Sequence, residues 1–273
     1  MKRERIGLKI ARVLYVLLFV FAAGLLCYQG FISKDLTSGN LVKGIFVGIA
    51  AIFGFLRTLH KPVRNKKSVY VSAYGKIIGN SFEDDPKLEK EFYKAIDDFH
   101  KSAYAAGIRK LEKLDEKCSH SAQRFAVQFF IAKCHENMNN NPAAMEAYHK
   151  ALTLRQHSSA ASNLGMCYMK AGNFDRSLEF YQLASRLDSK NPFPLNNIAQ
   201  LYIRQGEYES AIPYALRALE LEQNFQQALN ALTICYAMLD DQQQYEQYYR
   251  RSVSCGSDGS KLKAFIRSLQ DSN

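Results

Sequence analysis

The side chains best suited to chemistry in this sequence are its six cysteines and six histidines, but their spacing builds no metal or catalytic site. Cys134 directly precedes His135. Cys118 lies two residues before His120, and neither pair has a third partner at a spacing typical of zinc sites. The segment GSDGSK at 256–261 has the glycines of a phosphate-binding loop, but it lacks the Gly-Lys-Ser/Thr order and follows no predicted strand. The sequence therefore predicts no metal, no cofactor and no enzymatic activity.

A second candidate for chemistry is RTLHKPVRNKK, residues 57–67, a strongly basic stretch that could contact nucleic acid or another anionic surface. The whole chain carries a net charge of +10. Residues 1–82 hold 13 Lys/Arg and 2 Asp/Glu, whereas residues 83–273 hold 23 Lys/Arg and 24 Asp/Glu. The basic charge thus belongs to the N-terminal third, and the larger part of the chain lacks the basic surface that nucleic-acid binding needs. We expect no nucleic-acid partner.

The N-terminal third predicts a transmembrane helical hairpin. Residues 13–32 contain no charge over 20 residues, about the length of helix that crosses a bilayer. A short polar segment follows, and residues 41–56 are then apolar except for Lys43 near their start. A re-entrant or interfacial helix is the alternative for this second segment. The connection is short enough to make the two helices antiparallel.

The charges around these segments predict how the hairpin is oriented. Lys and Arg cluster before residue 13 and again over 57–67, and such clusters stay on the cytoplasmic side. We therefore expect a multi-pass protein of the cell membrane with both termini in the cytoplasm. On this interpretation the stretch Arg57–Lys67 anchors the hairpin and contacts anionic lipid headgroups.

Beyond the hairpin the sequence repeats itself every 34 residues. NLGMCYMKAGNFDRSLEFYQLASRL, from Asn163, aligns without gaps with NIAQLYIRQGEYESAIPYALRALEL, from Asn197. Positions that match at this spacing are Leu164 and Ile198, Tyr168 and Tyr202, Gly172 and Gly206, Phe174 and Tyr208, and Ala184 and Ala218. A fixed period of this length is typical of stacked helical hairpins.

The pattern from Leu164 to Ala184 resembles the tetratricopeptide repeat family. The best units are 158–191 and 192–225, although Ala161 and Ser189 replace the usual Trp and Pro of the repeat. Weaker units flank them, and residues 261–270 form an amphipathic segment that predicts a capping helix. The expected fold class is all-α: a two-helix transmembrane hairpin followed by a tetratricopeptide-type α-solenoid with a C-terminal capping helix.

The predicted organisation has three parts. Residues 1–67 form the hairpin with its basic flanks, and residues 88–273 form the repeat array. Between them, 68–87 is a linker for which a short helix is the first interpretation and a strand from VYVSAY the alternative. This order of parts resembles uncharacterised membrane-anchored tetratricopeptide repeat proteins of bacteria.

The resemblance implies a membrane-tethered scaffold that binds a segment of another protein in the concave groove of the array, where the first helix of each unit lies. The expected groove residues are Ser162, Asn163, Met166, Met169, Asn196, Asn197, Gln200, Arg204 and Asn230. Amides can pair with peptide backbone and methionines adapt to varied side chains, so we expect an extended or helical partner segment without strong charge selection.

Three other interpretations stay open at this point. The groove residues could be ordinary solvated helix faces, the array could bind nucleic acid, or the chain could be a membrane-anchored enzyme. The 34-residue register also predicts that Tyr202 is buried between two successive hairpins.

Overall fold

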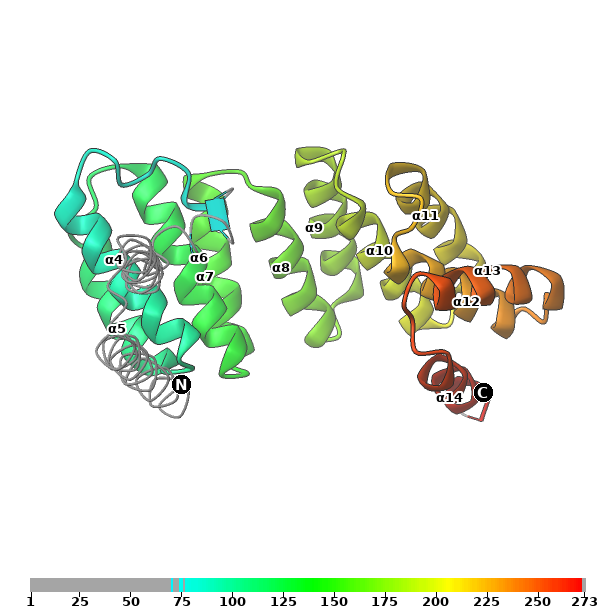
Figure 1. Cartoon of the computed structure of the whole chain (residues 1–273). Helices are drawn as coiled ribbons and strands as arrows, with labels where there is room; N and C mark the ends of the chain where they lie inside the picture. The colour runs from blue at the N-terminus through cyan, green and yellow to red at the C-terminus, as the bar shows by residue number, and fades with distance from the viewer. Residues whose placement is uncertain (1–69, 71–73, 76, 272–273) are drawn as a thin grey trace, which may run out of the picture. The chain divides into compact units, whose positions relative to one another are not determined.

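The computed structural model describes residues 70, 74–75 and 77–271, which belong to one compact unit, Tyr70–Asn273. Figure 1 shows its helices following one another from α4 to α14. Five antiparallel pairs come first, and a single helix ends the array. The pairs are α4 (Pro86–His100) with α5 (Tyr104–Asp115), α6 (Ser121–Asn137) with α7 (Asn141–Leu154), α8 (Ser158–Lys170) with α9 (Phe174–Leu187), α10 (Pro192–Gln205) with α11 (Tyr208–Leu221), and α12 (Gln226–Met238) with α13 (Gln242–Ser254); the last helix is α14 (Gly259–Gln270).

Each hairpin turns at a residue with a left-handed backbone. Gly172 and Gly206, which the repeat pattern places at turns, have φ values of 76° and 78°. The other three turns use Ser102, Asn139 and Asp240, with φ between 53° and 59°. Asn and Asp tolerate this conformation better than most residues. The loss of the glycine at position 240 therefore does not alter the turn.

Side-chain caps define where many helices begin. The Asp85 carboxylate accepts hydrogen bonds from two backbone N–H groups at the start of α4, and the Asn140 and Asn173 side chains each accept one at the start of α7 and α9. Proline stands in the first turn of α4, α7 and α10, where its missing N–H costs nothing. Local sequence thus sets the helix boundaries, and packing of the apolar faces sets the stacking.

The segment before α4 is packed against the array. Tyr74, Gly75, Ile77 and Ile78 are helical, so the strand alternative for VYVSAY is wrong at its described residues. The Tyr70 hydroxyl donates to the Asp97 carboxylate at 2.9 Å.

Aromatic pairs recur inside the hairpins at the repeat spacing. Tyr202 stacks on Tyr214 with ring centroids 5.6 Å apart, and both belong to the hairpin α10–α11. The pairs Tyr168–Phe180 and Tyr236–Tyr248 repeat this arrangement one period before and after. The prediction that Tyr202 is buried between successive hairpins is therefore wrong: it is only partly buried and stacks within its own hairpin.

The predicted fold class needs a correction: the described part of the chain is an all-α helical repeat solenoid, and no transmembrane hairpin is found in it. In the described part of the chain, no helix is both long enough and apolar enough to cross a membrane. The longest of α4–α14 is α6, with 17 residues, and all of residues 125–132 in this helix are buried within the array. The segments 13–32 and 41–56 lie outside the described residues, as do the lipid contacts expected at 57–67. The assignment to the cell membrane as a multi-pass protein, with its cytoplasmic termini, is withdrawn.

Candidate functional site

The first helices of the hairpins lie side by side along the array. Contacts join α8 to α10, α10 to α12, and α12 to α14. We call the surface along these four helices the first-helix face. All nine predicted groove residues belong to α8, α10 or α12, so their surroundings can be compared along this face.

Two of the predicted asparagines are already engaged inside the array. The Asn163 amide donates to the Tyr148 hydroxyl at 3.0 Å, and this hydroxyl donates to Glu136 at 2.8 Å. The Asn197 amide donates to the Ser162 hydroxyl at 3.0 Å, which joins α10 to α8. These hydrogen bonds join neighbouring helices of the array, so one N–H of each amide is already used.

Three other predicted residues converge on one cavity. Asn196 and Gln200 on α10 and Asn230 on α12 line an open space of about 550 Å³ that the C-terminal helix α14 also lines. We call it the amide cavity. Its further lining residues, which were not predicted, are Gln226, Gln227, Ile234, Ser257, Asp258, Lys261, Leu262 and Phe265. Met166, Met169 and Arg204 are not among its lining residues.

Asn196 is the most unusual residue of the amide cavity. Its side chain is 6% exposed, and its Oδ1 atom has no hydrogen-bond partner within the described structure. A buried polar atom without a partner costs about 1–3 kcal/mol, so such atoms are rare in folded proteins. The remaining buried polar contacts of the cavity are satisfied in a chain: Gln226 donates to Ser257 at 3.1 Å, and Ser257 donates to Asn230 Oδ1 at 2.6 Å.

The residues from α14 could have been found by extending the repeat register. Lys261 lies 34 residues after Gln227, so α14 occupies the place of a first helix in a sixth unit. A capping helix is expected to present polar residues outward, so the prediction of a cap at 261–270 did not suggest that α14 could line a site as a first helix does.

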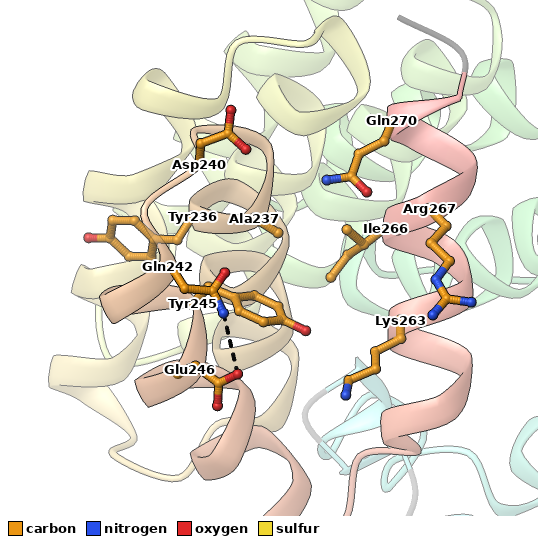
Figure 2. A pocket seen from close by; sticks show the side chains of 10 residues that line it. All are labelled: Tyr236, Ala237, Asp240, Gln242, Tyr245, Glu246, Lys263, Ile266, Arg267 and Gln270. Atoms are coloured by element: carbon orange, nitrogen blue, oxygen red, sulfur yellow. Dashed lines mark hydrogen bonds between the residues drawn. The ribbon is translucent and has the colours of Figure 1, made fainter.

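A second cavity lies on the other side of α14, and Figure 2 shows it from close by. This charged cleft, of about 400 Å³, separates α14 from the hairpin α12–α13. Lys263 and Arg267 of α14 lie across it from Glu246 of α13. The full lining set is Tyr236, Ala237, Asp240, Gln242, Tyr245, Glu246, Lys263, Ile266, Arg267 and Gln270.

Charges of both signs line the charged cleft, so it attracts neither anions nor cations strongly. Glu246 accepts a hydrogen bond from Gln242 at 3.4 Å, and Lys263 lies over the Tyr249 ring at 4.7 Å. Burial raises the pKa of Tyr245, which therefore stays neutral. In the described structure, no side chain of the cleft has a buried N or O atom that lacks a hydrogen-bond partner. It is a weaker candidate site than the amide cavity.

Chemistry at the cysteines is disfavoured by their surroundings. Burial raises the pKa of Cys134 and Cys235 to about 12, and that of Cys118 and Cys167 to about 11. These thiols are thus protonated at neutral pH and poor nucleophiles. In the part of the chain that the structure describes, no group of three His, Cys, Asp or Glu side chains could hold a metal ion. That the protein is not an enzyme stays a prediction.

Comparison with known proteins identifies the repeats. Models described as tetratricopeptide repeat match residues 156–224 and 196–260. The human intraflagellar transport protein 88 homolog is 23% identical over 138 residues, which are 48% of this chain and 17% of the human protein. The photosystem I assembly protein Ycf3 of Rippkaea orientalis is 29% identical over 99 residues, 30% of this chain and 57% of Ycf3. The chain thus spans well under two thirds of the length of each.

Solved structures share the fold at low sequence identity. MamA superimposes with a TM-score of 0.54 at 15% identity, covering 61% of this chain and 96% of MamA. YrrB, a tetratricopeptide repeat protein with an unusual peptide-binding site, superimposes with a TM-score of 0.53 at 12% identity, covering 70% of this chain and 97% of YrrB. The narrower likeness to membrane-anchored bacterial members is not shown by these matches. Residues 156–260 of this chain are thus tetratricopeptide repeats.

Proposed function

We propose that this protein is an interaction scaffold that binds a segment of another protein at the amide cavity of its first-helix face. Proteins of the tetratricopeptide repeat family are protein-interaction scaffolds, which supports the general role. The observation that carries the specific proposal is the convergence of Asn196, Gln200 and Asn230 on one cavity.

The charges of the cavity argue against nucleic acid as the ligand. Lys261 is the lysine among its lining residues, and its ammonium lies 3.4 Å from the Asp258 carboxylate. A groove that follows a phosphate backbone needs several unpaired cations. The amides instead match the N–H and C=O groups of a peptide.

Site-specific crosslinking in cells that naturally make the protein tests this proposal. A photoreactive phenylalanine analogue replaces Gln227, which is exposed and lines the amide cavity, or Arg217, which is exposed on the second helix α11. We expect position 227 to capture a defined protein, identified by mass spectrometry, that position 217 does not capture. Capture of the same proteins at both positions, or of none at 227, would contradict the proposal.

A further inference from the structure

We infer that α14 is a hinged helix, which detaches from the array about Gly256 while α4–α13 stay folded, and that Ser257 holds it in the closed position. In the closed position α14 lines the amide cavity, so the consequence for binding rests on the proposed function. Three features carry the inference: the small buried face of α14, the open space on two of its sides, and the anchoring of its start.

The buried face of α14 is the smallest among the first helices. It buries two residues, Leu262 and Ile266, whereas each of α4, α6, α8, α10 and α12 buries four or more. Phe265, in the middle of α14, is 47% exposed. Because packing of an apolar face supplies most of the stability of a helix in a protein, α14 is held to the array more weakly than the other first helices are.

Open space borders α14 on two sides. The amide cavity, of about 550 Å³, lies between α14 and the helices α10 and α12, and the charged cleft, of about 400 Å³, lies between α14 and the hairpin α12–α13. Leu262 lines the first space and Ile266 the second, so even the two buried side chains border a cavity. Figure 2 shows Ile266 on the side of α14 that faces the hairpin across the charged cleft. A narrow ridge of α14 therefore makes its contact with α12.

Ser257 anchors the start of α14. It lies two residues before the helix and is 8% exposed. Its hydroxyl donates to Asn230 Oδ1 at 2.6 Å and accepts from the Gln226 amide at 3.1 Å, and both partners belong to α12. We call these three residues the Ser257 clamp. Loss of the clamp removes the side-chain hydrogen bonds that tie Ser257 to α12.

The hinge is Gly256, which connects the end of α13 to the Ser257 clamp. Its φ is 97°, a left-handed value that favours glycine, and a Cβ atom added there would meet no atom within 4 Å. The backbone can therefore rotate at this residue without a side chain or a packed neighbour in its way. Such a change at the end of one element leaves the contacts between α12 and α13 in place, as is common for hinges.

Detachment of α14 has two consequences. A helix of 12 residues is marginal in water on its own, so α14 loses its helical hydrogen bonds when it leaves the array. The amide cavity loses Lys261, Leu262 and Phe265 at the same time. A partner that contacts both α12 and α14 binds the closed form, and its apparent affinity falls with the closed fraction.

Hydrogen exchange of the full-length chain, followed by mass spectrometry, tests the hinge. The amides of residues 262–270 should exchange together, and at least about 100-fold faster than those of α10 and α12. Low urea should hardly change the rate in α14, because a local opening exposes little surface, whereas it should accelerate exchange in α10 and α12 steeply. Equal rates and equal responses to urea would overturn the inference.

Matched serine variants separate a hinge from fraying of the last helix. Ser257→Ala removes the clamp and should speed exchange throughout 262–270 about tenfold, the ratio expected for one hydrogen bond. Ser254→Ala removes an exposed hydroxyl that donates to the Arg251 carbonyl within α13, and it should change these rates by less than about twofold. Fraying instead gives rates that rise toward Gln270 and do not respond to Ser257→Ala, and this outcome would contradict the hinge.

Matched glycine variants test the position of the hinge. Gly256→Ala strains the closed backbone and should speed exchange in α14. Gly206→Ala introduces a similar strain in the hairpin α10–α11, where φ is 78° and an added Cβ also meets no atom within 4 Å. Gly206→Ala should leave the α14 rates unchanged, because α14 opens without the array. If both variants speed exchange in α14 equally, the inference is wrong.

The link to binding is measured in the complex that is captured through position 227. A partner that holds α14 closed should slow exchange at 262–270 relative to the free protein. Unchanged exchange in this complex would show that α14 does not control the cavity, while the capture itself would still support the proposed function. Exchange in the free chain needs no partner, so the hinge is judged even if nothing is captured at position 227.

Discussion

Gly165 offers a sharp test of how closely the two helices of a hairpin approach. It lies in α8, and a Cβ atom added there would be 2.8 Å from two ring carbons of Tyr181 and 3.1 Å from the Ser177 carbonyl oxygen. Tyr181 is only 1% exposed and Ser177 is fully buried on α9. Neither the ring nor the backbone carbonyl can move aside without disturbing its neighbours.

The expected effect of Gly165→Ala is a balance of two terms. Alanine favours a helix over glycine by about 1 kcal/mol, whereas an extra methyl in a well-packed core costs about 1–3 kcal/mol. Because the predicted contacts are shorter than real Cβ atoms show, the packing term should be near its upper value. We expect the free energy of unfolding to fall by about 1–2 kcal/mol.

Gly107 provides the matched control. It is also a helical glycine, in α5, but an added Cβ would be 3.5 Å from the Ala95 oxygen and the Cys134 sulfur, which is ordinary contact. Gly107→Ala should therefore gain the helix term alone and raise the free energy of unfolding by up to about 1 kcal/mol.

Urea unfolding of the full-length variants, followed by circular dichroism, measures both changes. The slope of the free energy with urea must match that of the parent, because repeat arrays can lose cooperativity and the midpoints would then not compare. The reasoning is refuted if Gly165→Ala is as stable as the parent, or if the two variants shift in the same direction.

Three further predictions follow from burial. Tyr181→Ala should cost about 3–5 kcal/mol of unfolding free energy, whereas Tyr202→Ala, at a partly exposed ring, should cost clearly less; equal costs in urea unfolding would contradict this. Burial lowers the pKa of His149 in the folded state, so the unfolded state binds the proton more readily. The free energy of unfolding should therefore fall as the pH drops below about 6.5. His149→Gln should flatten this part of the curve when unfolding is measured as a function of pH. The buried cysteines are Cys118, Cys134, Cys167 and Cys235. A thiol reagent at about pH 8 should leave them unmodified in the native protein, as measured by peptide mapping. Rapid labelling before unfolding would contradict the packing.

Periodicity predicts the array well because it depends on short-range chemistry repeated at a fixed spacing. The 34-residue register places α8 to α11 within 158–191 and 192–225. Asp240 takes the place of the turn glycine in this register, and its backbone keeps the left-handed conformation with φ at 53°. The stacking of Tyr202 on Tyr214 could not be predicted in this way, since the register gives the position of a side chain along a helix and not the neighbour it faces.

The site is harder to predict than the fold, and two adjacent asparagines show why. Asn196 and Asn197 have the same chemistry and neighbouring places on one helix, so the sequence ranks them equally. A rotation of about 100° between consecutive helical residues turns Asn197 toward Ser162, 35 residues earlier, and Asn196 toward the cavity. Which of them has a partner depends on contacts between hairpins, and the periodicity of one helix does not contain that information.

The polar groups of the array are satisfied to different degrees from one hairpin to the next. On α6, α7 and α8 a network forms in which Lys133 pairs with Glu136 at 3.0 Å, Glu136 accepts from Tyr148, and Tyr148 accepts from Asn163. His135 Nδ1, also on α6, is buried without a partner in the described structure. Such a network loses its own hydrogen bonds if a ligand displaces any member. Around α10, α12 and α14 the Asn196 oxygen is buried and has no partner in the described structure. Unfavourable local chemistry that is kept in a folded protein commonly marks a functional site. If the proposed binding at the amide cavity is right, truncating α14 should remove binding, because α14 lines that cavity, whereas Asn163→Ala should mainly reduce stability.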